Sequence, residues 1–290
     1  MSYAALPVAL LVLATGCSPE TSTRTGGQPA EAPDPTDQVL ALVLPFDKYE
    51  PTQQESYRAA KARDFLIEEC MEKRGHEWEI LRYPTHVDEM KNRRRYGVIE
   101  IQVAREFGYH ANSAILSGET DVPRQRDERD KRLDADGIQA AYNEKSGCGY
   151  KANDVLVPAE AGVDHDLFNR LSSSLLTKAK KDTKVVQVTR NWAKCMRERG
   201  YAYKTPDEAI GDPRWWKRKS DKPTSDEREV AVADVQCKSQ VSLVDTLFTT
   251  ESGIQAQAIK QHHAYFSKLS AAQTKYLARI NEVIEAKGTP

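Results

Sequence analysis

The feature that most constrains this chain is a short pattern that occurs twice, each time around a cysteine. Cys70 and Cys195 are each followed by Met, two variable residues, Arg-Gly, two further variable residues and an aromatic side chain. Apolar side chains precede each cysteine at helical spacing, and Gly75 and Gly200 stand where a helix ends on a left-handed residue. Each copy therefore predicts a helix, a glycine that ends it and a short extended segment.

The N-terminus is typical of the export signal of a lipoprotein. Residues 4–14 form an uncharged apolar run. This run is shorter than the roughly 20 residues that a helix needs to span a bilayer, and it fits the apolar core of a signal peptide. Small residues then lead into Cys17, which resembles a bacterial lipobox. The resemblance implies a diacylglyceryl group on the Cys17 sulfur and cleavage after Gly16, so residues 1–16 are the expected signal peptide.

Two alternatives stay open at this end of the chain. The first residues lack Lys and Arg, which departs from the signal-peptide pattern and points to a start upstream of Met1. A buried N-terminal helix with a core cysteine is the other alternative, although polar, Pro-rich sequence follows at once. Residues 17–38 carry no aliphatic side chain larger than Ala. They cannot bury enough apolar surface to fold, so we expect a flexible tether.

With Cys17 assigned to lipid, four of the five cysteines remain. An even number in an exported chain predicts two disulfides, and four cysteines allow three pairings. One further cysteine follows each copy of the repeat, so the simplest pairing is Cys70–Cys148 and Cys195–Cys237. A redox pair or a metal site is the alternative, but neither a Cys-x-x-Cys motif nor a histidine at ligand spacing favours it. A Cys70–Cys195 link would contradict the two-unit scheme.

The predicted fold is mainly α with minor β. It consists of two disulfide-linked helical units, residues 39–160 and 161–290, with short β pieces after each repeat. Apolar residues from 225 onward recur at spacings of three and four, which predicts a long C-terminal helix or a helical hairpin with a break near Gly253. The charged run 121–132 has little apolar content and is expected to be a loop.

The order of these features resembles a group of actinobacterial secreted lipoproteins of unknown function. Beyond the lipobox and the Cys-Met units, the resemblance rests on Tyr96-Gly97, Gly108-Tyr109-His110, Gly147-Cys148 and the segment 229–238. It covers most of the mature chain and implies a helix over residues 97–107. It also implies a location on the extracytoplasmic face of the cell membrane, and it implies no particular activity.

The sequence predicts no reaction. It contains no nucleophile elbow, no P-loop and no His-Glu-x-x-His motif, so the catalytic residues stay unknown and no cofactor or metal is predicted. A formal net charge of −1 provides no bulk basic field, which argues against nucleic acid as a partner.

Two features are candidates for a binding surface. Trp215 and Trp216 precede three basic residues, and aromatic rings beside cations can stack on sugars or bases or lie at a membrane interface. The alternative is that one of the two tryptophans packs in the core. His110 is the second candidate because the resemblance includes it; the alternative there is a hydrogen-bonded turn histidine.

These features favour a binding or scaffold module of the cell envelope, held on the membrane through the lipid on Cys17. Its expected partner is an envelope protein or a cell-wall polymer. The alternative is a cell-wall-active hydrolase with an unrecognised active site. A cleft lined by His110 and carboxylates would favour the hydrolase, whereas an exposed patch at Trp215 and Trp216 would favour binding.

Overall fold

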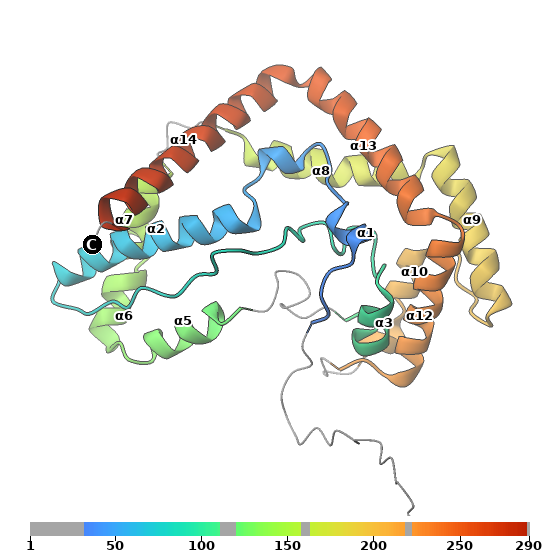
Figure 1. Ribbon diagram of the computed structural model, residues 1–290, viewed down its shortest axis with the longest axis horizontal. Helices are drawn as coiled ribbons and strands as arrows, with labels where there is room; N and C mark the ends of the chain where they lie inside the picture. The colour runs from blue at the N-terminus through green and yellow to red at the C-terminus, as the bar shows by residue number, and fades with distance from the viewer. Residues whose placement is uncertain (1–31, 111–119, 158–162, 218–221, 289–290) are drawn as a thin grey trace, which may run out of the picture. The chain divides into compact units, whose positions relative to one another are not determined.

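The computed structural model describes residues 32–110, 120–157, 163–217 and 222–288 (Figure 1). The predicted signal peptide, Cys17 and most of the predicted tether lie outside these ranges. Within them the chain is mainly helical and contains no strand, so the mainly-α prediction is confirmed and the minor β pieces are not formed there. None of the described helices is both long enough and apolar enough to cross a membrane.

The first half of the chain forms short helices around one longer helix. Their bounds are α1 (Asp37–Leu40), the 3-10 helix η1 (Asp47–Tyr49), α2 (Gln53–Glu72), α3 (Ile101–Phe107), α5 (Val122–Asp130), α6 (Ala135–Tyr142) and α7 (Cys148–Leu156). The second half has longer helices: α8 (His165–Lys180), α9 (Thr183–Glu198), α10 (Pro206–Ile210), α11 (Pro213–Trp216), α12 (Ser225–Gln240), α13 (Leu243–Gln261) and α14 (His263–Gly288).

Both copies of the repeat end their helix in the same way. Gly75 and Gly200 have φ values of +80° and +91°. The residue after each glycine donates its N–H to the carbonyl of the repeat methionine, at 3.0 Å to Met71 and at 2.9 Å to Met196. This is the bonding of a Schellman cap, which requires the left-handed backbone that glycine adopts without strain. Both methionines are fully buried beneath the turn.

The predicted disulfide pairing is confirmed. Cys70 bonds to Cys148 with a Cα–Cα distance of 5.6 Å, and Cys195 bonds to Cys237 with a Cα–Cα distance of 5.7 Å. The first bond joins the end of α2 to the start of α7, and the second joins α9 to α12. Each Cys-Met helix is therefore covalently fixed to the helix that covers it.

The extended segment after the first repeat has no strand partner because side chains take its backbone donors. The N–H of Leu81 donates to Asp64 Oδ2 at 3.2 Å, and the N–H of Arg82 donates to Gln125 Oε1 at 2.9 Å. A β ladder would otherwise satisfy these groups. The segment stays extended without pairing.

The charged run 121–132 contains the helix α5, so the expected loop was wrong. Arg129 is only 5% exposed, and its Nη1 donates to Asp64 Oδ1 at 3.1 Å. Its guanidinium also lies 3.7 Å from the ring centroid of Trp78. A buried ion pair and a cation–π contact thus anchor this helix where apolar side chains are scarce.

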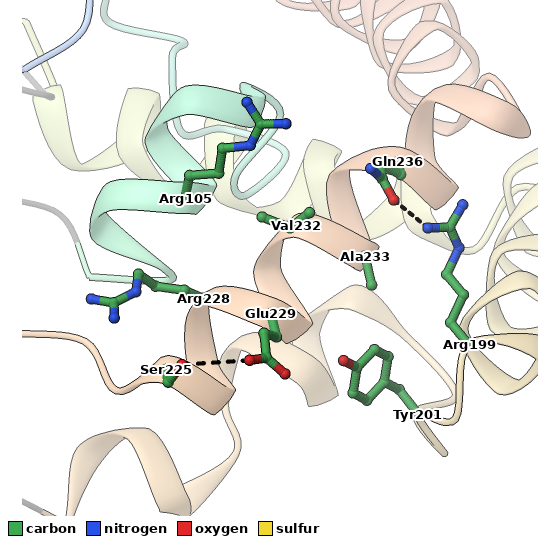
Figure 2. Close-up of a pocket in the computed structure, with 9 residues that line it drawn as sticks. All are labelled: Arg105, Arg199, Tyr201, Ser225, Arg228, Glu229, Val232, Ala233 and Gln236. Atoms are coloured by element: carbon green, nitrogen blue, oxygen red, sulfur yellow. Dashed lines mark hydrogen bonds between the residues drawn. The ribbon is translucent and has the colours of Figure 1, made fainter. Parts of the chain in front are cut away.

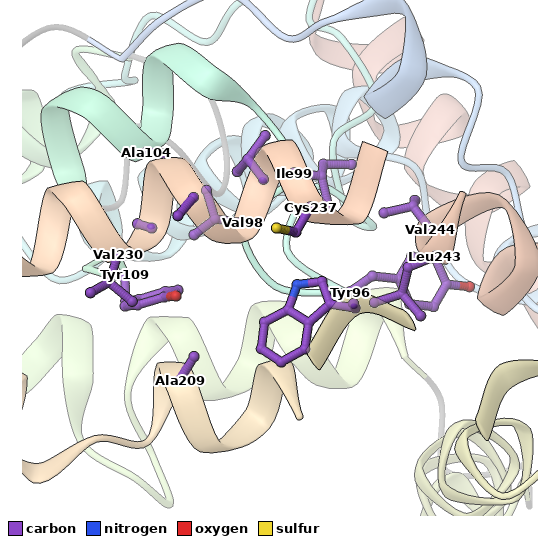
Figure 3. Packing of buried hydrophobic residues seen from close by; sticks show 14 of the residues in the cluster. Tyr96, Val98, Ile99, Ala104, Tyr109, Ala209, Val230, Cys237, Leu243 and Val244 are labelled. Carbon is purple, nitrogen blue, oxygen red and sulfur yellow. The ribbon is translucent and has the colours of Figure 1, made fainter. Parts of the chain in front are cut away.

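The largest core cluster surrounds α12, which packs against α3, α9 and α13 (Figure 3). Trp192 and Cys237 belong to it and are fully buried. The cluster includes Tyr96 and Tyr109 from the first half of the chain. Residues 31–290 form one compact unit, so the packing crosses the predicted boundary at residue 160.

The folded unit begins earlier than the predicted tether end at residue 38. Arg93 and Glu100 form a buried ion pair, with 2.7 Å between Nε and Oε2, and this pair binds the backbone of residues 33–36. Arg93 donates to the carbonyl of Pro33 at 2.6 Å, and Glu100 accepts from the N–H of Thr36 at 3.1 Å. Because long-range polar contacts fix these residues, their low apolar content gave no indication of order.

The C-terminal region from Ser225 consists of the three helices α12, α13 and α14, and its breaks lie at residues 241–242 and at His262 rather than near Gly253. Gly253 lies inside α13, which packs against α8 and α9. The following helix, α14, packs along α2 (Figure 1). Ile280 and Ala62 are buried in the cluster between them.

Candidate functional site

The structure brings together two residues that the sequence singled out separately. The imidazole of His110 and the indole of Trp216 stack with ring centroids 4.6 Å apart and planes 33° apart. Trp216 is 49% exposed, whereas the His110 side chain is 13% exposed. The pair therefore presents one open aromatic face with a largely buried histidine beside it.

Trp216 is fixed by a hydrogen bond of its own. Its Nε1–H donates to the carbonyl of Ile210 at 2.8 Å, and α11 begins at Pro213 under an Asp212 cap. This bond ties the edge of the indole to α10 and leaves the ring partly open to solvent. Lys217 follows and is exposed, while the two further basic residues, 218 and 219, lie outside the described residues.

Trp215 is not part of the surface, which corrects its assignment as a binding residue. It is 4% exposed, and its Nε1–H donates to the carbonyl of Ala209 at 2.8 Å. Adjacent residues on a helix point about 100° apart, so one indole enters the core while the other faces out. The alternative that one tryptophan packs in the core is the one observed.

Glu227 is the residue that sequence reasoning missed. It is fully buried at the start of α12, and its Oε1 lies 2.7 Å from His110 Nδ1 and accepts from the N–H of Tyr109 at 2.8 Å. When Nδ1 carries the ring proton, it donates to this carboxylate and leaves Nε2 for other partners. The carboxylate thus fixes the orientation of the imidazole.

The sequence around Glu227 contains a helix-capping pattern, which indicates a local role for this residue rather than a contact with His110. Thr224 caps α12, because its Oγ1 accepts from the N–H of Glu227 at 3.1 Å. A Thr with Glu three residues later is the signature of a capping box, in which the Glu side chain bonds back to the cap. Here the carboxylate turns inward to the His110 segment instead, a contact over more than 100 residues that no local pattern indicates.

Gly108 explains the Gly-Tyr-His motif. Its φ is +55°, and a Cβ at this position would lie 2.6 Å from Glu227 Oε1 and 3.0 Å from Pro223 Cβ. Any side chain would push Glu227 away from His110. Glycine lets the backbone approach, Tyr109 enters the core at 2% exposure, and His110 faces Trp216.

The second oxygen of Glu227, Oε2, is buried and has no hydrogen-bond partner among the described residues. A buried carboxylate oxygen without a partner is costly, and removal of another contact to the same group would add to that cost. This makes the contacts of Oε1 to His110 and Tyr109 important for the local structure.

A groove of about 420 Å³ runs along the neighbouring face of α12 (Figure 2). Its lining residues are Arg105, Arg199, Tyr201, Ser225, Arg228, Glu229, Val232, Ala233 and Gln236. The three arginines come from α3, from the end of α9 and from α12. The groove is positively charged, although the whole chain is nearly neutral.

Among the described residues, no group of three His, Cys, Asp or Glu side chains is placed to hold a metal ion. Comparison with known proteins gives no further guide, because no family model, no curated protein and no solved structure matches this chain. The resemblance to actinobacterial lipoproteins stays a prediction.

Proposed function

We propose that this protein is a binding module of the cell envelope, held at the membrane by lipid on Cys17, and that it binds a cell-wall glycan at Trp216. The observation that carries the proposal is the stack of Trp216 on His110, with the imidazole oriented by buried Glu227. An open indole face suits the apolar C–H face of a sugar ring. An imidazole beside it can hydrogen-bond to a sugar hydroxyl.

Both rings are held in place before any ligand arrives. Trp216 is bonded to the Ile210 carbonyl, and His110 is bonded to Glu227 at 2.7 Å. Side chains that are already ordered lose less conformational entropy on binding. This rigidity supports a recognition role for the solvent-exposed indole of Trp216.

The test is co-sedimentation of the detergent-solubilised, full-length protein with insoluble cell wall. Trp216→Ala should weaken binding at least about fivefold, since stacking on an aromatic ring is worth roughly 1–3 kcal/mol. Tyr150→Ala is the matched control, because Tyr150 is 45% exposed on α7, outside the candidate site. Equal binding by the wild-type and Trp216→Ala proteins would rule out glycan recognition at this site.

The lipid anchor has a separate test. Mass spectrometry of the mature protein should find a diacylglyceryl-modified Cys17 at the N-terminus, and Cys17→Ser should move the protein from the membrane fraction to the soluble fraction. A mature chain that starts at an unmodified Met1 would refute the anchor without affecting the glycan site.

A second candidate function is hydrolysis of the wall, with His110 as a general base. The observation in its favour is the carboxylate of Glu227 at Nδ1, because a carboxylate there leaves Nε2 able to accept a proton from substrate. Incubation of the protein with purified wall decides between the two. Release of soluble sugar fragments that His110→Ala abolishes would establish the enzyme, whereas binding without release supports the binding module.

A further inference from the structure

We propose that the groove formed by Arg105, Arg199 and Arg228 binds the acidic groups of an anionic glycan. The inference rests on the proposed function and deepens it, because it specifies that the wall polymer bound at Trp216 is negatively charged. Arginine suits this role since its planar guanidinium can donate two parallel hydrogen bonds to a carboxylate or a phosphate.

The positive charge of the groove is only partly neutralised by the acidic side chain in its lining. The lining contains three arginines and a single carboxylate, that of Glu229, which accepts from the Ser225 hydroxyl at 3.4 Å (Figure 2). The guanidinium groups of Arg105 and Arg228 form no ion pair with a described residue. The lining therefore carries a local charge of +2, from three positive groups and one negative group.

The internal repeat provides an independent comparison for Arg199. Its counterpart in the first repeat, Arg74, donates to the carbonyls of Ala140 and Ser146 at 3.2 and 2.7 Å, and so it fixes the chain between α6 and α7. Arg199 instead donates to the side-chain amide oxygen of Gln236, an exposed residue that lines the same groove. Arg74 thus has a structural role in the first repeat, whereas Arg199, at the same position of the second repeat, lines the groove.

The groove and the site at Trp216 take residues from the same two elements, α12 and the segment that begins with α3. On α12, Arg228 directly follows Glu227, the residue that orients His110. On the other side, α3 carries Arg105 and leads within five residues to His110. In this proposal, one sugar of the polymer therefore lies on Trp216 and its acidic groups lie in the groove at Arg228 and Arg105.

The experiment compares two polymers with the same backbone, polygalacturonate and its methyl ester, which differ only in charge. At low ionic strength the full-length protein should bind polygalacturonate at least about fivefold to tenfold more tightly, as two or three exposed ion pairs allow. This preference should decline as salt is added, because exposed charges are screened.

The variant Arg105→Gln/Arg228→Gln should lose the preference and keep its affinity for the methyl ester. Arg190→Gln on α9 is the matched control, since Arg190 is exposed and lies outside the groove. A preference that survives in the double variant, or equal binding of the two polymers by the wild-type protein, would overturn the groove proposal. In that case Trp216-dependent binding of the methyl ester would leave the proposed function intact.

Anionic phospholipid is the competing source of acidic groups. Vesicles of phosphatidylglycerol should bind the wild-type and the double variant equally. Arginine-dependent binding to these vesicles, together with no binding to polygalacturonate, would show that the groove recognises a membrane surface and would contradict the assignment to a glycan.

Discussion

Trp192 donates its indole N–H to Asp234 at 2.9 Å, and both side chains are fully buried. The other oxygen of Asp234 accepts from Lys238 Nζ at 2.9 Å. The first unit contains the same combination of groups, in which Trp78 donates to Asp64 at 3.3 Å and a buried arginine completes the set. Each disulfide-linked unit thus has a tryptophan, an aspartate and a cation at its centre.

Asp234→Ala should lower the free energy of unfolding by about 3–5 kcal/mol, because it leaves Lys238 buried without its counter-ion. Burial raises the pKa of Asp234, although Lys238 opposes this shift. The double variant Asp234→Asn/Lys238→Met replaces both charges and should be less destabilised than Asp234→Ala. Urea unfolding followed by circular dichroism measures both. A cost below about 1 kcal/mol for Asp234→Ala would show that the pair is not important for stability.

Gly108→Ala should weaken wall binding, because the added Cβ would lie 2.6 Å from Glu227 Oε1 and would separate Glu227 from His110. Gly75→Ala is the control. Gly75 has a similarly positive φ, but nothing lies within 4 Å of its added Cβ, so that variant should lose about 1 kcal/mol of stability and keep its binding. Wall sedimentation and thermal unfolding separate the two effects. Full binding by a folded Gly108→Ala protein would contradict the role of the Glu227–His110 contact.

The features that the sequence predicted well are those with a local cause. The helix-ending glycines and the disulfide pairing follow from short motifs or from the repeat. The missed features depend on contacts distant in sequence. The helix α5 relies on the ion pair between Arg129 and Asp64, and the order of residues 33–36 relies on Arg93 and Glu100.

In the candidate site, too, local features could be predicted from the sequence and long-range contacts could not. Single residues could be selected from motifs, but the stacking of His110 on Trp216 brings the residues after α3 against α11, a contact over about 100 residues that no local pattern indicates. The contact of Glu227 with His110 could not be predicted, because a Glu three residues after Thr224 is what a helix-capping pattern alone would account for. The sequence could not predict which of Trp215 and Trp216 is buried. That depends on the orientation of α11, and a helix of four residues is too short to show a hydrophobic periodicity.

The two disulfides should contribute strongly and similarly to stability. Cys195→Ser/Cys237→Ser opens a link between residues 42 positions apart, and the chain-entropy model assigns such a link about 4 kcal/mol. Cys70→Ser/Cys148→Ser opens a separation of 78 positions and should cost slightly more, since loop entropy grows with the logarithm of length. Urea unfolding of both variants checks this. A loss of less than 1 kcal/mol in either variant would be inconsistent with the model.

Asp47 should make the stability depend on pH in the acid range. Burial raises its pKa above 3.8, although hydrogen bonds from the Leu44 N–H at 2.7 Å and from Asn92 at 2.6 Å oppose the shift. A carboxyl group with a raised pKa in the folded state contributes most below its unfolded pKa, and this contribution is lost as the pH rises through the folded value. The wild-type protein should therefore lose stability relative to Asp47→Asn as the pH increases from about 3 to 6. Urea unfolding of both proteins across this range measures the difference, and a difference that does not change with pH would contradict the raised pKa.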